Sequence, residues 1–455
     1  MLTDKEKNNL QTYAQCHSWN LMTQMKEYLE HPMIIERGEG CWLYDIHGNK
    51  YLDGNASMWK NVHGHNHPAL NAVLLQQIGK FADTTYVSRS HEPGLRLAHK
   101  LATIAPEGLT RSFFTNNGST AIESALKLSF QYWQLIGKPQ KMKVISLDEG
   151  HHGLSFGATA VSNQPQMHGR FKPWCFPCLY FPSPKCSEYA GKVYYEEDTE
   201  SLKNLEALLE KYAEETACVI LEASIQSVAG NGMKLQPRGF LKKVEKLCKA
   251  YDVHLILDEV FVGFGRTGSL LASHEANVSP DFLCLGKGIA SGYLPLGATL
   301  VKETIYQSFL GDFIEGKTFI HGHTYGGNAL ATAVALKSIE LLEERITKGI
   351  LSQGVEDFGM ITRQYFADHP FIKELRQRGF MCAIDLYPGS QKKGFSPLER
   401  IGYKVSQYAL TKGILIRAYK DTLFLIPPLS ISKDEMEFFC QKISKSISEY
   451  INNRI

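Results

Sequence analysis

The chain has 455 residues, of which 44% are hydrophobic and 21% charged, and its formal net charge is +2. This length and composition predict a globular protein of two or three lobes with a large core. The near-neutral charge gives no general attraction to nucleic acid or to anionic membranes. The N-terminal segment is polar, and no apolar run reaches the roughly 18 residues of a membrane span, so we expect a cytoplasmic protein.

The first clear pattern is a β-hairpin followed by a loop rich in histidine. Apolar and polar residues alternate on either side of His47-Gly48-Asn49, which predicts the hairpin. Three histidines then fall within the five residues from His63 to His67. They lack the helical spacing of histidines in zinc enzymes, so a metal site is not favoured. Pro68 suits the first turn of a helix that we expect to run to Lys80.

Helical and strand-like runs alternate from about residue 94 to residue 285, which predicts βαβ units. Strands are expected at 112–115, 143–146 and 219–222, and a helix at 121–135. The small polar residues 116–120 open this helix. Free N–H groups at such a helix start bind phosphate, although the same residue types also serve as ordinary N-caps. No Gly-x-Gly-x-x-Gly follows the early strands, which argues against a nucleotide-binding dehydrogenase.

The most informative stretch lies between Val253 and Leu294. Two short apolar runs predict neighbouring buried strands, the first ending on Asp258 and Glu259 and the second leading to Lys287. Ligands of parallel sheets bind beyond the carboxyl ends of the strands, so Asp258 and Lys287 are expected to face one crevice. Pyridoxal phosphate needs a lysine amine for its aldehyde and an anion beside its ring nitrogen. On spacing alone, a structural ion pair between these two residues is an equal alternative.

Three of the ten cysteines cluster in one loop, at Cys175, Cys178 and Cys186, with His168 just before them. Zinc accepts thiolate and imidazole ligands, but the second pair of ligands typical of such sites is missing. We therefore interpret this segment as a surface loop and expect no metal. Farther along, a long amphipathic helix is expected from Ala329 to about residue 344, and a separate α/β lobe from about residue 346.

Several motifs carry a resemblance to a known family: NNGSTAIESALK, LDEVFVGFGRTG, GKGIASGYLPLGA, HGHTYGGN and GILIRAY. They resemble class III aminotransferases, which are pyridoxal-phosphate enzymes of fold type I. The resemblance implies an α/β fold, with a mostly parallel seven-stranded sheet in a large domain and a smaller α/β domain built from both chain ends. It places the N-terminal part of the small domain at 1–75, the cofactor-binding domain at 76–328, and the linking helix and C-terminal small domain at 329–455.

The resemblance also implies roles for single residues. Lys287 corresponds to the lysine that binds the cofactor and moves protons during catalysis, and Asp258 to the partner of its ring nitrogen. The other implied cofactor-binding residues are Gly118, Ser119 and Thr324 of the partner subunit at the phosphate, His151 and Val260 on the two ring faces, and Gln226 near the phenolic oxygen. Implied substrate-binding residues are Arg417, which would receive a carboxylate, Trp59 and Met22. His151 stands where the family usually has tyrosine.

Other stretches, WNLMTQM, ASMWKNVHGHNHPALN and FQYWQLIGKP, resemble the branch of this class that converts 8-amino-7-oxononanoate to 7,8-diaminononanoate in biotin biosynthesis. The expected amino donor is S-adenosylmethionine, or lysine or another amine, because Met58 replaces one ring of a tryptophan pair. The alternatives are an ω-amine or diamine transaminase of the same class, and a catalytically silent module that only binds pyridoxal phosphate. An active site shared between subunits implies a homodimer.

Overall fold

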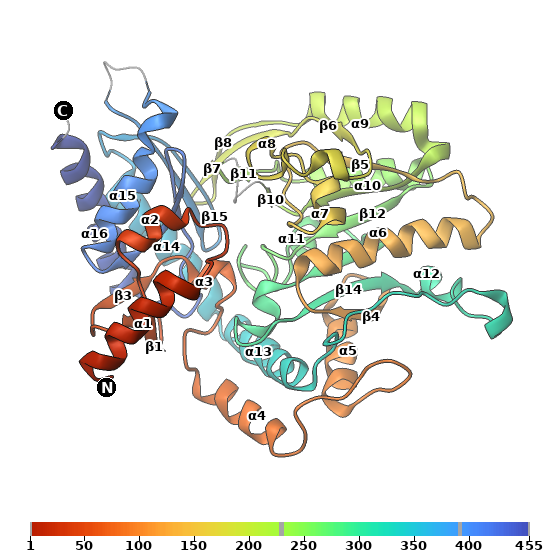
Figure 1. The fold of residues 1–455 in the computed structure, drawn as a ribbon. Helices are drawn as coiled ribbons and strands as arrows, with labels where there is room; N and C mark the ends of the chain where they lie inside the picture. The colour runs from red at the N-terminus through yellow and green to blue at the C-terminus, as the bar shows by residue number, and fades with distance from the viewer. Residues whose placement is uncertain (1, 227–231, 390–393, 454–455) are drawn as a thin grey trace.

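The computed structural model describes residues 2–226, 232–389 and 394–453 (Figure 1). A seven-stranded sheet forms the centre of the larger lobe. Its strands, in spatial order, are β4 (Leu109–Thr115), β14 (Gly297–Lys302), β13 (Phe282–Leu285), β12 (His254–Asp258), β9 (Thr216–Glu222), β5 (Lys143–Leu147) and β6 (Leu179–Phe181). Only β14 runs antiparallel to its neighbours. The predicted α/β fold with a mostly parallel seven-stranded sheet is confirmed.

Strand β9 shows how the sequence builds this sheet. All of its residues are buried, which explains why the run is continuously apolar and does not alternate. Cys218 and Ile220 belong to one hydrophobic cluster with helices α6 (Gly118–Leu135) and α7 (Phe156–Val161). Val219 and Leu221 belong to the other cluster, with α5 (Glu92–Ile104), α9 (Thr199–Tyr212) and α10 (Phe240–Ala250). The sheet is therefore covered by helices on both faces.

The smaller lobe is built from both ends of the chain, as Figure 1 shows by the red and blue segments lying together. One sheet has the order β1 (Ile35–Glu39), β2 (Trp42–Asp45), β3 (Lys50–Asp53) and β17 (Ile414–Leu415). A second has the order β15 (Ile372–Arg378), β16 (Met381–Leu386), β19 (Thr422–Leu425) and β18 (Arg417–Tyr419). Helices α14 (Ile350–Phe366) and α15 (Ile401–Leu410) both pack against α16 (Lys433–Asn452).

The predicted elements are found close to their expected bounds. The hairpin β2–β3 turns at 46–49, and the helix expected from Pro68 is α4 (Pro68–Ile78) with proline in its first turn. The long helix is α13 (Ala329–Thr347), which packs against α4 and α5. The expected domain boundary at 75 falls inside α4, and the division of the chain into domains stays a prediction.

The sequence did not indicate several short or exposed elements. They are α1 (Asp4–His17), α2 (Met25–Glu30), α3 (Ala56–Trp59), α8 (Pro165–His168), α11 (Ala272–Ala276), α12 (Glu303–Gln307), and the two-stranded pairs β7 (Lys185–Tyr189) with β8 (Lys192–Glu197) and β10 (Ile225–Gln226) with β11 (Lys234–Leu235). Among the described residues, no helix combines the length and apolar character that crossing a bilayer requires.

Candidate active site

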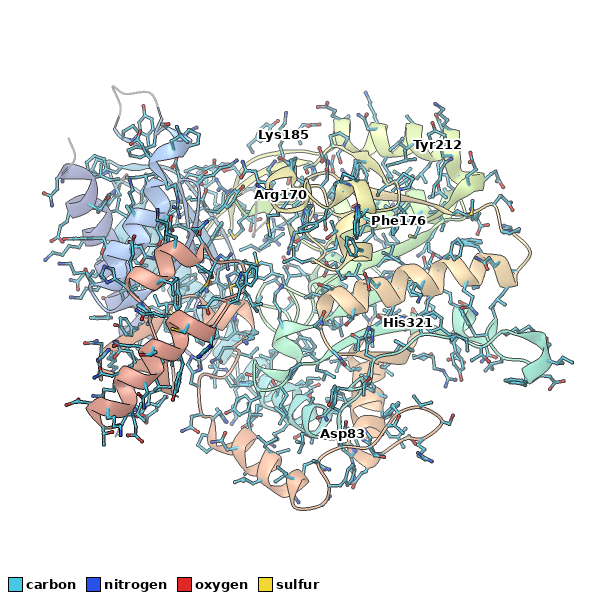
Figure 2. The ribbon with its side chains drawn as sticks, viewed as in Figure 1. Asp83, Arg170, Phe176, Lys185, Tyr212 and His321 are labelled. Carbon is cyan, nitrogen blue, oxygen red and sulfur yellow. The ribbon has the colours of Figure 1, made fainter. Side chains whose placement is uncertain are left out.

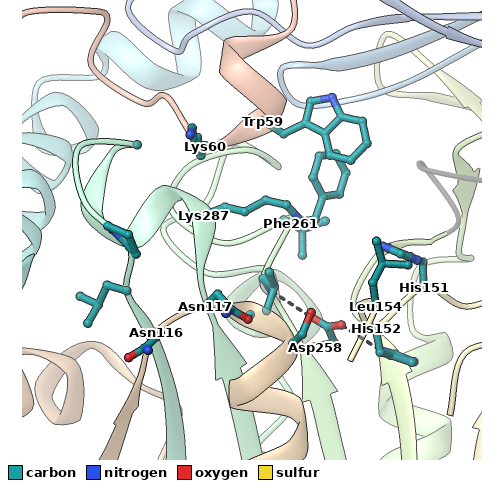
Figure 3. A pocket seen from close by; sticks show the side chains of 18 of the residues that line it. Trp59, Lys60, Asn116, Asn117, His151, His152, Leu154, Asp258, Phe261 and Lys287 are labelled. Carbon is teal, nitrogen blue, oxygen red and sulfur yellow. Dashed lines mark hydrogen bonds and ion pairs between the residues drawn. The ribbon is translucent and has the colours of Figure 1, made fainter. Parts of the chain in front are cut away.

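A cavity of about 700 Å³ lies beyond the carboxyl ends of β12 and β9 (Figure 3). Its walls come from segments far apart in the sequence. They include the start of α6, the loop after β5, the ends of β9 and β12, and the segments that carry Trp59 and Lys287. Lys287 and Asp258 both line it, as the position of their strands predicts. The structure shows no ion pair between Asp258 and Lys287. The alternative that they only form a structural ion pair is therefore not supported.

The carboxylate of Asp258 is held in place from two sides. One oxygen accepts a hydrogen bond from the backbone N–H of Val260 at 2.9 Å. The other lies 2.8 Å from Nδ1 of His152, which is itself buried. Two fixed partners leave the carboxylate little freedom to rotate, so its orientation toward the cavity is set before any ligand binds.

Lys287 follows the neighbouring parallel strand β13, so it enters the cavity from the same carboxyl-end edge of the sheet as Asp258. Burial lowers the pKa of its amine from the ordinary value of 10.5, while the nearby negative charges of Asp258 and Glu222 act in the opposite direction. The backbone of Lys287 has a φ of +41°, a conformation that costs a non-glycine residue energy and that clusters at functional sites. A larger unprotonated fraction makes this amine a better nucleophile than an exposed lysine.

The start of α6 forms a tight cradle. A Cβ added to Gly118 would lie 2.4 Å from Cγ1 of Val260, and one added to Gly153 would lie 2.0 Å from Oγ of Ser119. Asn117 caps the helix through its side chain, which accepts a hydrogen bond from the backbone N–H of Thr120 at 3.1 Å. The N–H groups at the start of an 18-residue helix are thus presented to the cavity, where an anion such as phosphate can bind.

Two aromatic rings stand over Lys287. Trp59 and Phe261 meet edge to face, with ring centroids 5.1 Å apart. The amine of Lys287 lies 5.6 Å from the first ring centroid and 5.5 Å from the second. Trp59 is carried by α3, whose four residues all have positive φ. Asp53 supports this left-handed turn, because its carboxylate accepts hydrogen bonds from both the N–H and the hydroxyl of Ser57.

The opposite wall is formed by His151 and His152. The backbone N–H of His151 donates to Oε2 of Glu222 at 2.9 Å, which joins this loop to the end of β9. Burial and the positive charges around it hold the pKa of the His151 ring well below its usual value. The ring is therefore neutral, and a neutral flat ring can pack against a flat ligand.

Most of the cofactor-binding residues expected from the sequence come together here. Gly118, Ser119, His151, Asp258, Val260 and Lys287 all line the cavity, as does Trp59. Gln226 does not: its amide donates to the carbonyl of Asp148 at 3.0 Å and to Oγ of Ser183 at 2.7 Å. Met22, which was expected to bind substrate, is not among the lining residues, although its neighbour Leu21 is.

Arg417 and Thr324 lie outside the lining of this cavity. Nη1 of Arg417 is 2.7 Å from Sδ of Met58, and its guanidinium lies 6.0 Å from the ring centroid of Trp59. Burial lowers the pKa of Arg417. Thr324 is exposed, in the segment that joins β14 to α13.

Glu222, Phe261 and His152 are site residues that the sequence reasoning missed. Glu222 ends β9 directly opposite Asp258 in the strand register, so the argument used for Asp258 would also have found it. The carboxylate of Glu259, next to Asp258, faces away and accepts the backbone N–H groups of Ala272 and Ser273, each at 2.7 Å.

The clustered cysteines Cys175, Cys178 and Cys186 do not line the cavity. Sγ of Cys175 and Sγ of Cys178 both lie against backbone carbonyls, and burial raises the pKa of Cys178 to about 12. A thiol with so high a pKa is a poor metal ligand. In the part of the chain that the structure describes, no group of three or more His, Cys, Asp or Glu side chains could hold a metal ion.

The sequence model of the family Aminotransferase class-III matches residues 23–447. The chain belongs to this family of pyridoxal-phosphate-dependent aminotransferases. It is 41% identical to the adenosylmethionine-8-amino-7-oxononanoate aminotransferase of Aquifex aeolicus (strain VF5), over 98% of both chains. The crystal structure of the enzyme with that name from Methanocaldococcus jannaschii DSM 2661 matches with a TM-score of 0.90 and 38% identity, over 97% of this chain and 99% of that one.

A thermostable (S)-enantioselective omega-transaminase from Thermomicrobium roseum also matches, with a TM-score of 0.88 and 28% identity, over 97% of this chain and 98% of that one. The backbone is thus nearly as similar to this transaminase as to the Methanocaldococcus enzyme, whereas the sequence is not. The fold alone therefore defines the class, and the sequence identity carries the narrower assignment.

The residues of the cavity fit pyridoxal phosphate. A fixed carboxylate, an amine with a lowered pKa, two aromatic rings, a flat neutral imidazole and a glycine-lined helix start all border one space. Bound there, the cofactor would act as an electron sink that weakens the C–H bond next to a substrate amine. Lys287, Asp258 and the start of α6 are the residues that could hold it.

Proposed function

We propose that this chain transfers an amino group to 8-amino-7-oxononanoate, giving 7,8-diaminononanoate for biotin biosynthesis, with S-adenosylmethionine as the donor. The observation that carries the proposal is the pair Lys287 and Asp258, which line one cavity without pairing with each other. It is supported by the identity of 41% over 98% of the chain to a relative whose name states this acceptor and this donor.

The roles proposed for the residues follow from their positions. Lys287 would bind the cofactor aldehyde, and its freed amine would take the proton from the donor carbon and later return one. Asp258, fixed by Val260 and His152, keeps the ring nitrogen protonated. The N–H groups of Gly118 and Ser119 bind the phosphate at the helix start. Val260 and His151, which line the cavity, would hold the ring, and the guanidinium of Arg417 would receive the substrate carboxylate.

The two rings over Lys287 support a cationic donor. The sequence suggested that Met58 removes part of an aromatic surface, but Phe261 supplies a second ring beside Trp59, with centroids 5.1 Å apart. A sulfonium ion is attracted to the faces of such rings, by about 0.5–2 kcal/mol depending on its exposure to water. Lysine remains the second candidate donor, because its ammonium would be attracted in the same way.

The first prediction concerns Lys287→Ala. The purified variant should lose the visible absorbance of covalently bound cofactor and form no 7,8-diaminononanoate, because it lacks the amine that would bind the cofactor aldehyde. Product is measured by mass spectrometry after incubation with 8-amino-7-oxononanoate and, in parallel, S-adenosylmethionine, lysine or a simple amine. The matched control is Lys302→Ala, which removes a half-buried lysine paired with Asp281 at 2.9 Å, and should retain activity.

Three outcomes separate the candidate functions. Product with S-adenosylmethionine alone supports the proposal in full, and product with lysine alone changes only the donor. Amine consumption without turnover of 8-amino-7-oxononanoate would make the protein an ω-amine transaminase. A Lys287→Ala variant that keeps wild-type activity would overturn the assignment of the lysine.

We also propose a cytoplasmic homodimer in which Thr324 contributes to the phosphate site of its partner. Apolar side chains are exposed at Leu75 (70%), Val87 (75%), Ile320 (83%) and Tyr325 (65%). The segment leading to Thr324 is fixed beside α6, where Nδ1 of His321 lies 3.0 Å from the amine of Lys127 (Figure 2). A second copy of the chain would cover these side chains.

A further inference from the structure

His151, in the cavity wall, is paired with a second histidine behind it. His168 is the last residue of α8 and is completely buried. The two rings are stacked, with centroids 5.3 Å apart and an angle of 20° between their planes. Nδ1 of His151 lies 3.3 Å from Nε2 of His168, so one of these nitrogens donates a proton to the other.

The direction of that hydrogen bond follows from a third group. The backbone N–H of Gln164 donates to Nδ1 of His168 at 3.3 Å. An N–H group can only donate, so Nδ1 of His168 carries no proton. Burial lowers the pKa of His168 to about 4, so the ring is neutral at physiological pH and its single proton is on Nε2. Between the two rings, Nε2 of His168 is therefore the donor and Nδ1 of His151 the acceptor, beside a backbone hydrogen bond that the His168 ring makes with Gly153.

The same reasoning assigns the proton of the His151 ring. Nδ1 of His151 accepts a hydrogen bond and carries no proton, and the ring is neutral because burial and the charges of Lys287 and Arg417 oppose a further charge. The proton of His151 must then be on Nε2, a nitrogen with no hydrogen-bond partner among the described residues. Figure 3 shows this ring in the wall that faces the aromatic pair.

We propose that His168 is a positioning residue that fixes His151 in the Nε2–H tautomer, so that the cavity wall presents an uncharged hydrogen-bond donor to the ligand. Such a donor binds an oxygen acceptor, such as a carbonyl or carboxylate, and cannot accept from an ammonium group. Tyrosine, which the family usually has at this position, needs no such partner because its hydroxyl rotates to donate. In this chain, the second histidine performs that orienting role.

The test reads the tautomer directly. The protein is labelled with ¹⁵N in its histidine rings, and long-range ¹H–¹⁵N spectra are recorded with and without bound cofactor. The signals of His151 are identified by their loss in His151→Phe. We expect an unprotonated Nδ1 and a protonated Nε2. His63 serves as an internal reference, because its Nε2 lies 2.9 Å from the carbonyl oxygen of Ser338 and must also carry its proton there.

Two substitutions of the second histidine test its orienting role. His168→Phe keeps a flat ring but removes the donor, so His151 should become a mixture of both tautomers while the signals of His63 stay unchanged. His168→Gln places an amide N–H near the original Nε2 and should keep the wild-type spectrum. With the complete enzyme, His168→Phe should lower kcat/KM for the oxo substrate about fivefold, the usual effect of one neutral hydrogen bond, and His168→Gln should restore most of it.

A wild-type spectrum with the proton of His151 on Nδ1, or a charged ring at neutral pH, would overturn the inference. So would an unchanged His151 spectrum in a folded His168→Phe variant. If that variant does not fold, the wild-type spectrum alone still decides the tautomer. These results do not depend on which substrate the enzyme uses, so a failed assay with 8-amino-7-oxononanoate would leave them intact.

Discussion

Two adjacent carboxylates in this protein have different environments and different consequences. Asp258 is turned to the cavity and held by His152 and Val260. Glu259 is turned away, fully buried, and accepts two backbone N–H groups at the start of α11. Neighbouring residues of a strand point to opposite sides, so a shift of one position exchanges catalytic and structural roles.

The second prediction uses this contrast. Asp258→Asn should lower kcat by about a hundredfold, because losing a charged hydrogen bond to the cofactor ring costs about 3 kcal/mol. Its melting temperature should change little. Glu259→Gln should do the reverse, lowering the free energy of unfolding by about 1–3 kcal/mol while activity per folded molecule is kept. Steady-state kinetics and urea unfolding of both variants check this. Equal effects of the two substitutions on kcat would contradict it.

For single residues, the positions of Asp258 and Lys287 at strand ends predicted that they would share a cavity. Ligands of a parallel sheet bind beyond the carboxyl ends of its strands. It could not predict side-chain partners that depend on loop conformation. His152 was visible in the sequence, but its contact with Asp258 depends on the turn after β5. Gln226 was expected at the cofactor from the family resemblance, yet its amide donates to Asp148 and Ser183.

Among the elements, helix α6 links sequence to site most directly. Asn117 and Thr120 form a capping box that fixes where the helix begins, and this places Gly118 and Ser119 at the cavity. The close packing of Val260 on Gly118 means that the helix start and the end of β12 cannot move independently.

The third prediction is that Gly118→Ala weakens cofactor binding at least about tenfold. The added methyl would lie 2.4 Å from Cγ1 of Val260, and such overpacking typically costs 1–3 kcal/mol. The backbone itself does not oppose alanine, which is the better helix former. Cofactor affinity is measured by titrating the cofactor-free protein. The double variant with Val260→Ala restores the space and should bind the cofactor as well as Val260→Ala alone; if it binds less well, the clash is not the cause.

The long elements were predictable because they bury an apolar face, and the short ones were not. Helix α1 buries none of its residues, so it has no apolar periodicity to detect. The signal that was present is a capping box: Oγ1 of Thr3 accepts from the N–H of Glu6, whose carboxylate accepts from the N–H of Thr3 at 2.8 Å. A three-residue strand such as β6 depends on its pairing with β5, which is distant in sequence.

For the molecule as a whole, three buried histidines make stability depend on pH. Burial lowers the pKa of His63, His168 and His254 to about 4, whereas their ordinary value is 6.5. Between these two values the unfolded chain binds more protons than the folded one, so protonation favours unfolding. Stability from these groups is therefore present above pH 6.5 and falls as the pH is lowered toward 4.

The fourth prediction follows from this sign. The free energy of unfolding should decrease between pH 7 and pH 5 by on the order of 2 kcal/mol per histidine. Urea unfolding at fixed protein concentration measures it. His63→Gln, which keeps a donor for the carbonyl of Ser338, should reduce the decrease by about a third. Equal or greater stability at pH 5 would show that these rings are not neutral in the folded state.

The fifth prediction tests the shared site. Lys287→Ala and Thr324→Ala should each have low activity, but hybrid dimers should contain one intact site, formed by Lys287 of one subunit and Thr324 of the other. Refolding an equal mixture should recover about a quarter of wild-type activity under random pairing. No recovery above the Thr324→Ala level would mean that Thr324 acts within its own subunit. Wild type refolded alone controls for losses.

The parallel pairing of β3 with β17 has a consequence for synthesis on the ribosome. Leu52 of β3 is completely buried, and its neighbour in the sheet is Ile414. The nascent chain must therefore carry an open sheet edge and unshielded apolar side chains until its last tenth has emerged. During that interval the growing polypeptide is prone to aggregate, and holdase chaperones would find their substrate there.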